Sequence, residues 1–142
     1  MSELIKSEYA IFTACNLAYL PKALVLAESL LKNGEQKLKI YVIDRKCDVK
    51  LPVDLAEFIW IEDAEVPDLM DLAFRYDVTE FSTSIKPYIA LRLLEKFQKV
   101  IFMDPDTCIY RPLSKIIEIL DNNSVVLTPH YTNPHQDDGD QP

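Results

Sequence analysis

The order of apolar segments along the chain limits its fold more than any other feature. Segments rich in β-branched and aromatic residues, typical of strands, alternate with segments whose apolar residues recur at helical spacing. The predicted strands are residues 8–15, 37–45, 57–62, 99–104 and 124–128. The predicted helices are residues 19–34, 68–78, 84–97 and 112–123. This alternation predicts an α/β fold, with a mostly parallel central sheet and helices on both of its faces.

Turn residues and apolar spacing define two of the predicted helices. Pro21 suits the first turn of helix 19–34 and Gly34 suits its end, because proline lacks an N–H and glycine accepts a positive φ. Pro87 is likewise expected in the first turn of helix 84–97. The residues expected to face the core are Leu20, Ala23, Leu24, Ala27, Leu30 and Leu31 in the first helix and Ile89, Leu93, Leu94 and Phe97 in the second.

Glycine content and net charge exclude several kinds of ligand site. The 142 residues include two glycines, Gly34 and Gly139. A dinucleotide fingerprint needs three glycines at fixed spacing, and a P-loop needs two followed by Lys-Ser/Thr, so neither motif is present. The net charge is −8, and no basic stripe is available to replace the counterions of a nucleic acid. We therefore expect no nucleic-acid partner, and a bound nucleotide would be held without a glycine-rich loop.

The hydropathy, the N-terminal sequence and the cysteine content favour a cytoplasmic protein. No apolar run approaches the roughly 18 residues of a transmembrane segment, and the N-terminus lacks the pattern of a secretory signal. Cys15, Cys47 and Cys108 are odd in number and have no CxxC spacing, which favours reduced thiols over a zinc site or disulfides. We predict one α/β domain over residues 1–128 and a loop or tail over residues 129–142. Because the chain stops soon after a predicted strand, we expect it to be a piece of a longer protein.

The stretch VIFMDPDTCIY, residues 100–110, places two carboxylates directly after an apolar run. In an extended chain Asp104 and Asp106 lie on the same side, and Pro105 ends the strand pairing because it has no N–H. Mg²⁺ and Mn²⁺ prefer oxygen ligands such as carboxylates and diphosphates. The pair therefore suits a divalent cation bound with a nucleotide diphosphate, although two solvated aspartates in a proline turn would give the same sequence. A haloacid-dehalogenase-type phosphatase, with its D-x-D-x-T pattern, fits less well because Cys108 occupies the threonine position.

Several stretches together resemble the GT-A-fold glycosyltransferases, most closely the group of glycogenin and the lipopolysaccharide galactosyltransferases. KVIFMDPDTCIYRPLSKI is similar to the DxD segment of that group. FTACNLAYLPKALVLAESLLKNG resembles its first strand, nucleotide-contacting loop and first helix, and LKIYVID resembles its second strand. EFSTSIKPYIALRLLEKF resembles the helix before the DxD strand, and VVLTPH resembles the strand that follows. These segments occur in the family's order and cover most of the chain.

This resemblance implies a metal-dependent enzyme that transfers a sugar from a nucleotide diphosphate donor. The donor would be a UDP-sugar, and the acceptor a glycan or a lipid-linked glycan, as in polysaccharide biosynthesis. Asp104 and Asp106 would hold Mn²⁺ or Mg²⁺. The residues implied to contact the nucleotide-sugar are Thr13, Ala14, Asn16, Tyr19, Lys86, Asp104 and Asp106. No residue of this chain is assigned as catalytic.

Each of these contacts has a structural alternative. Asn16 suits a helix cap, and Tyr19 could cover the apolar face of the first helix. Lys86, close to a predicted helix start, could be a solvated side chain, although a cation there opposes the helix dipole. Asp44, at the end of the second predicted strand, could form a cap or reach the nucleotide.

Members of the resembled family carry an acceptor-binding region downstream, and several carry a later histidine that binds the metal. Neither is recognisable here, and His130 and His135 lie in the predicted tail without helical spacing. We therefore expect a donor-binding half with weak nucleotide binding and little transfer. One alternative is a non-catalytic nucleotide-sugar-binding module that pairs with itself or with a partner subunit. Another is a nucleotidyltransferase, which would normally carry a glycine-rich loop where this chain reads TACNLAYLP.

Overall fold

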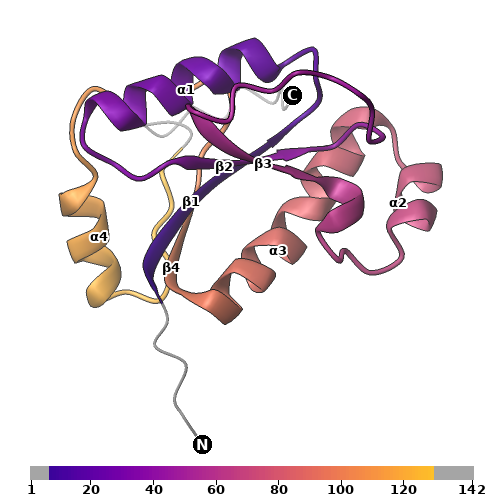
Figure 1. The fold of residues 1–142 in the computed structure, drawn as a ribbon. Helices are drawn as coiled ribbons and strands as arrows, with labels where there is room; N and C mark the ends of the chain where they lie inside the picture. The colour runs from indigo at the N-terminus through magenta and orange to yellow at the C-terminus, as the bar shows by residue number, and fades with distance from the viewer. Residues whose placement is uncertain (1–6, 130–142) are drawn as a thin grey trace, which may run out of the picture.

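The computed structural model describes residues 7–129 and contains a sheet of four parallel strands. The strands are β1 (Ser7–Cys15), β2 (Leu38–Val42), β3 (Ala56–Trp60) and β4 (Phe97–Phe102). Their order in the sheet is β3-β2-β1-β4, and each neighbouring pair is parallel. Figure 1 shows the strands crossing the middle of the molecule, with helices on both sides. The predicted α/β fold is confirmed.

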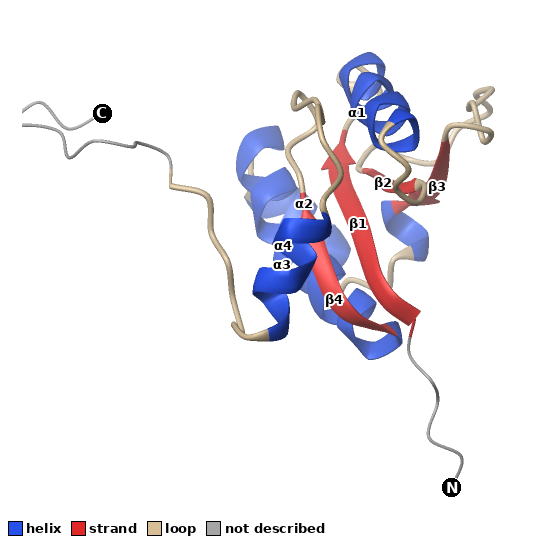
Figure 2. Ribbon diagram, turned by 90° about the vertical axis from the view of Figure 1, so that its left-hand side faces the viewer, coloured by secondary structure: helices blue, strands red, loops and turns tan. Residues whose placement is uncertain are grey.

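Two helices cover each face of the sheet. They are α1 (Leu20–Lys32) and α4 (Ser114–Asp121) on one face, and α2 (Leu69–Arg75) and α3 (Val78–Lys96) on the other. A short 3₁₀ turn, η1 (Ile61–Asp63), follows β3. Figure 2 shows β1 and β4 side by side between these layers. The structure therefore has three layers, with one apolar core on each face of the sheet.

The side chains of β1 divide between the two cores because successive residues of a strand point to opposite faces. Ile11 and Cys15 belong to the core beneath α1 and α4. Phe12 and Ala14 belong to the core beneath α3. All four are at most 5% exposed, so β1 is buried on both faces, as expected of a central strand in a parallel sheet.

Helix α1 has the ends that its sequence predicts. Pro21 lies in the first turn, and Gly34 follows the last turn with a φ of +78°. The N–H of Glu35 donates to the carbonyl of Leu30 (3.0 Å) and the N–H of Gly34 to that of Leu31 (3.1 Å). This pair of bonds is the Schellman motif, which favours glycine because it requires a left-handed residue.

Helix α3 begins earlier than predicted, so Pro87 lies inside the helix and not in its first turn. The carboxylate of Asp77 accepts hydrogen bonds from the N–H groups of Thr79 and Glu80, both at 2.8 Å. The carboxylate of Glu80 accepts one from the N–H of Asp77 at 3.2 Å. This capping box starts the helix at Val78, and packing against β1 and β4 retains the helix through the proline.

The predicted inward faces are correct in part. Ala23, Ala27, Leu30, Ile89 and Leu93 are buried. Four other predicted positions, Leu20, Leu24, Leu31 and Phe97, are half-buried, and Leu26 is buried although it was not predicted. Leu94, in contrast, is 39% exposed. The buried residues of α3 are Phe81, Ile85, Ile89 and Leu93, which share one face of the helix. Leu94 lies about 100° around the helix axis from Leu93, so it points away from that face.

Residues 124–128 do not form the predicted fifth strand. Within residues 7–129, β4 pairs only with β1, and no neighbouring strand pairs with this segment. Val125 is 71% exposed and Leu127 is 83% exposed. An apolar run of this length forms a strand only where another strand satisfies its backbone groups, so the prediction was wrong here.

No helix within residues 7–129 is long and apolar enough to cross a membrane. Residues 1–6 and 130–142, with His130 and His135, lie outside the described residues.

The strand order places a ligand site at a definite edge of the sheet. The chain winds outward from β1 through β2 to β3, and then returns to the other side of β1 as β4. In open α/β sheets, ligands bind beyond the carboxyl ends of the strands where the winding direction reverses. That position lies between β1 and β4, where Phe12 is paired with Phe102.

Candidate functional site

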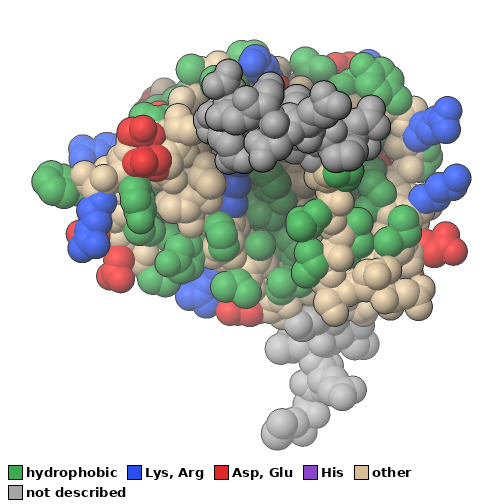
Figure 3. All heavy atoms as spheres, turned by 180° about the vertical axis from the view of Figure 1, so that it is seen from behind, with side chains coloured by type: hydrophobic (Ala, Val, Ile, Leu, Met, Phe, Trp, Pro, Cys, Tyr) green, Lys and Arg blue, Asp and Glu red, His purple; other side chains and the backbone are tan. Residues whose placement is uncertain are grey.

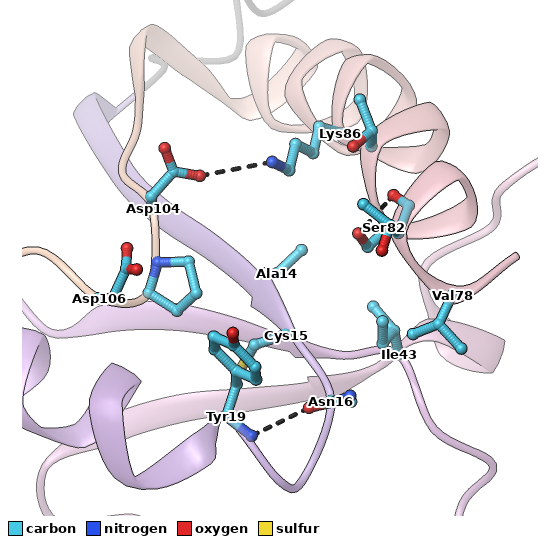
Figure 4. A pocket seen from close by; sticks show the side chains of 13 residues that line it. Ala14, Cys15, Asn16, Tyr19, Ile43, Val78, Ser82, Lys86, Asp104 and Asp106 are labelled. Atoms are coloured by element: carbon cyan, nitrogen blue, oxygen red, sulfur yellow. Dashed lines mark hydrogen bonds and ion pairs between the residues drawn. The ribbon is translucent and has the colours of Figure 1, made fainter. Parts of the chain in front are cut away.

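A cavity of about 390 Å³ lies beyond the carboxyl ends of β1 and β4 (Figure 4). One side is formed by the end of β1 and the turn into α1, and another by the loop after β4. Helix α3 closes a third side. The lining residues are Ala14, Cys15, Asn16, Tyr19, Ile43, Val78, Thr79, Ser82, Thr83, Lys86, Asp104, Pro105 and Asp106.

The part of the cavity formed by Asn16 and Tyr19, here called the turn side, is held by backbone hydrogen bonds. The Asn16 side-chain oxygen accepts from the N–H of Tyr19 at 2.9 Å. The carboxylate of Asp44, which follows β2, accepts from the N–H of Leu17 at 2.5 Å. Asn16 therefore stabilises the turn before α1, and Asp44 fixes that turn to the neighbouring strand.

The ring of Tyr19 lies along the cavity in Figure 4. It is 46% exposed and does not belong to either apolar core, so it does not cover the apolar face of α1. The ammonium of Lys22 lies 4.5 Å from the ring centroid. The ring is therefore exposed at the cavity, with the ammonium of Lys22 over one of its faces.

The opposite part of the cavity carries Lys86, Asp104 and Asp106, here called the charged side. The Lys86 Nζ lies 3.4 Å from Asp104 Oδ1, and Figure 4 shows the lysine reaching from α3 toward that carboxylate. The side chains of Lys86 and Asp104 are 27% and 59% exposed, so this ion pair is open to solvent. Such a pair is weak and can exchange its partners for a charged ligand.

The two aspartates are presented by a turn that follows β4. The N–H of Met103 donates to the carbonyl of Phe12 at 3.0 Å and continues the pairing with β1 for one more residue. The Thr107 hydroxyl and N–H both donate to the carbonyl of Asp104, at 2.7 and 3.1 Å. The aspartates are thus turn residues, and their side chains also line the cavity on the same side (Figure 4).

Residues 10–138 match the sequence profile of the family described as Glycosyl transferase family 8. The chain belongs to this family. The family has the GT-A fold and includes glycogenin and lipopolysaccharide galactosyltransferases, so the resemblance seen in the sequence is confirmed. Comparison with individual curated proteins gives no match. Membership indicates glycosyltransferase activity with a nucleotide-sugar donor and a glycan acceptor, and the family is generally metal-dependent.

For this family 8 chain, the structure brings together six of the seven residues implied to contact the donor. They are Ala14, Asn16, Tyr19, Lys86, Asp104 and Asp106, and they come from three separate parts of the sequence. Thr13 does not line the cavity. It is fully buried on the face of β1 that it shares with Ile11 and Cys15, and its hydroxyl has no hydrogen-bond partner among the described residues.

The α3 side of the cavity is the part that the sequence reasoning missed. Val78, Thr79, Ser82 and Thr83 line it together with Lys86. Once the helix starts at Val78, the spacing of residues 79, 82, 83 and 86 places them on one face. The signal that would have found them is the D-x-x-E capping pattern of residues 77–80.

Cys15 also lines the cavity, although the residue is only 4% exposed. Burial, together with the nearby negative charge of Asp44, raises the pKa of this thiol to about 11. The group therefore remains protonated near neutral pH. Cys47 and Cys108, in contrast, are exposed.

Proposed function

We propose that this cavity is the donor site of a glycosyltransferase and binds a nucleotide diphosphate sugar. One observation carries the proposal: residues from β1, α3 and the loop after β4 meet around one cavity at the point where the strand order reverses. Six of the seven residues that the family resemblance implies are among them, and Thr13 is the exception. The side chains suited to a nucleoside and those suited to a diphosphate lie on different sides of the cavity.

The turn side suits the nucleoside. The exposed ring of Tyr19 offers a stacking surface for a base, beside a turn that hydrogen bonds to Asn16 and Asp44 hold in place without a glycine-rich loop. The charged side suits the diphosphate and the sugar, because Lys86 supplies a positive charge and the hydroxyls of Ser82 and Thr83 lie on the same face of α3. We assign the base to the turn side and the phosphates to the charged side.

A divalent cation fits the charged side by the chemistry of its ligands. Asp104 and Asp106 offer hard carboxylate oxygens on one side of the cavity, and both are exposed. Asp104 and Asp106 are the acidic residues among those that line the cavity, so two carboxylates are available there. Mg²⁺ or Mn²⁺ bound by two carboxylates normally completes its shell with phosphate and water oxygens. When bound, the cation would stabilise the negative charge of the leaving diphosphate.

The reaction proposed for this site is transfer of a hexose to the hydroxyl of a glycan or glycolipid. The bond between the sugar's anomeric carbon and the diphosphate oxygen breaks, and a bond to the acceptor oxygen forms. A UDP-sugar is the proposed donor because of family membership. Lys86 would hold the diphosphate through charge as it leaves.

Calorimetric titration of UDP into the chain, with and without Mn²⁺, tests the proposal. We expect binding by the wild type that is at least about ten-fold tighter with Mn²⁺, because the cation joins the diphosphate to the two aspartates. The variant with both Asp104→Asn and Asp106→Asn should lose this metal effect, since an amide carries no charge. The matched control, Asp121→Asn on α4, should keep it. Equal binding with and without the metal would contradict the proposed cation site, and no binding in any condition would contradict the donor site.

A non-catalytic module that pairs with a second subunit is the other candidate function. Within the described residues, β4 is an edge strand, and edge strands expose backbone groups that can pair with another chain. Apolar side chains are also exposed on the face opposite to the one seen in Figure 1 (Figure 3). Among the described residues, Val125 and Leu127 are two of the exposed apolar side chains. A dimer in sedimentation experiments, combined with no UDP binding, would favour this function over the donor site.

A further inference from the structure

Lys86 has a second partner besides Asp104. Its ammonium lies 4.5 Å from the centroid of the Phe102 ring, within the range of a cation–π interaction. Phe102 is the last residue of β4, and it is 36% exposed. Phe102 does not line the cavity itself, but it supports the lysine that does.

The Phe102 ring packs against the apolar core beneath α3. It contacts the ring of Phe12, with centroids 5.3 Å apart and planes inclined by 58°. Phe12 is 1% exposed and packs edge-on against Tyr41 at 6.0 Å. Because Phe12 and Phe102 are also paired across β1 and β4, the backbone and the side chains hold the ring in one place.

The two partners of Lys86 differ in their effect on its charge. Asp104 neutralises the ammonium, and it is the group that a divalent cation would also bind. The Phe102 ring attracts the ammonium through its quadrupole and leaves the full positive charge available to an anion. A lysine held by a ring has less side-chain freedom to lose when it meets a diphosphate.

We propose that Phe102 is a positioning residue for the diphosphate, acting through Lys86. The ring holds the ammonium over the cavity when a ligand or cation draws Asp104 away. This inference rests on the donor site proposed above. It concerns the phosphate part of the ligand and assigns no direct contact between Phe102 and the nucleotide.

A double-mutant cycle on UDP binding tests the inference, with Phe102→Leu, Lys86→Gln and the variant carrying both. Leucine keeps an apolar side chain but removes the ring face. In the Lys86 background, we expect Phe102→Leu to weaken UDP binding about two-fold to five-fold, the range of an exposed cation–π interaction. In the Lys86→Gln background, the same substitution should change the affinity by less than about 1.5-fold, because the cation is gone.

Two further variants separate positioning from simple packing. Phe102→Tyr keeps the ring face and should bind UDP within about two-fold of the wild type. Phe97→Leu is the matched control, because Phe97 is the first residue of β4 and has the ammonium of Lys39 at 5.4 Å from its ring centroid, but it does not line the cavity. This control should leave UDP affinity unchanged.

The possible failures are distinguishable. An equal loss of affinity from Phe102→Leu in both backgrounds would mean that the ring acts on the fold of β4, which would overturn the inference while the donor site stands. A loss from Phe97→Leu of the same size would overturn it in the same way. A wild-type chain that binds no UDP would overturn the proposed function and this inference together.

Discussion

The turn side and the charged side of the cavity are built in different ways. On the turn side, the oxygens of Asn16 and Asp44 are already bonded to backbone N–H groups. On the charged side, Lys86 and Asp104 form a solvent-exposed ion pair at 3.4 Å. The turn side is therefore a preformed surface, whereas the charged side holds charges that a ligand can take over.

This difference indicates how the two sides would contribute to binding. A preformed surface contributes shape, and its contribution should depend little on salt. Exposed charges contribute attraction for an anion, and that attraction is screened at high ionic strength. If this is so, the turn side should resist change, and substitutions on the charged side should act mainly on binding.

The largest effect is expected in the reactivity of Cys15, the lining residue that directly precedes Asn16 of the turn side. Its pKa is raised from 9.0 to about 11, so its reactive thiolate fraction at pH 8 is about a hundred-fold below that of an ordinary thiol. Iodoacetamide at pH 8 should therefore modify Cys47 and Cys108 much faster than Cys15, as followed by peptide mapping. The rate at Cys15 should rise with pH up to about 11, because deprotonation is what limits it. Modification of all three cysteines at similar rates would mean that the turn side is open.

The second-largest effect is expected from Asp44→Ala, which should destabilise the turn before α1. It removes the charged hydrogen bond to the N–H of Leu17 and leaves that donor without its partner, which should lower the free energy of unfolding by about 2 kcal/mol. Urea denaturation measures this change. The control is Asp48→Ala, which removes an exposed carboxylate in the loop after β2 and should have little effect. Similar stabilities for the two variants would show that Asp44 does not hold the turn.

Lys86→Gln should affect binding and leave stability nearly unchanged, since its ion pair with Asp104 is exposed. We expect UDP to bind about five-fold to ten-fold more weakly, because a charge-assisted contact with the diphosphate is lost. The wild type should also show a steeper loss of affinity with added salt than the variant. Lys115→Gln, the same change on α4, provides the comparison. If Lys115→Gln weakened UDP binding as much, the effect would reflect net charge and not the charged side.

The sequence predicted the architecture well because the alternation of apolar segments is a strong signal for a parallel sheet. It was less successful where the decisive contact lies outside the segment itself. Pro87 suggested a helix that begins at residue 84, but the capping box at Asp77 and Glu80 starts α3 six residues earlier, at Val78. Residues 124–128 have strand-like composition, yet no neighbouring strand pairs with them.

The candidate site shows the same limit. The resemblance implied Ala14, Asn16, Tyr19, Lys86, Asp104 and Asp106, and these do line one cavity. It also implied Thr13, but that side chain is fully buried within the sheet and does not line the cavity. The hydroxyl-bearing face of α3 escaped notice because its residues share a face only when the helix begins at the right place.

The smallest predicted effect follows from the position of Thr13. Thr13→Val replaces a fully buried hydroxyl that has no partner among residues 7–129 with a methyl group of similar size. We expect the free energy of unfolding to rise by about 1 kcal/mol and UDP affinity to stay the same. Thr13→Ser, which keeps the hydroxyl and loses the methyl, should instead destabilise the fold. Loss of UDP binding in Thr13→Val would show that Thr13 belongs to the site.

A crystal structure of the chain with UDP and Mn²⁺ would show whether the cavity beyond β1 and β4 is the donor site, because it shows where the nucleotide lies. We expect the base against Tyr19, the diphosphate within reach of Lys86, and the cation bound by Asp104 and Asp106. A nucleotide bound outside the cavity, or a cation bound without either aspartate, would contradict this expectation.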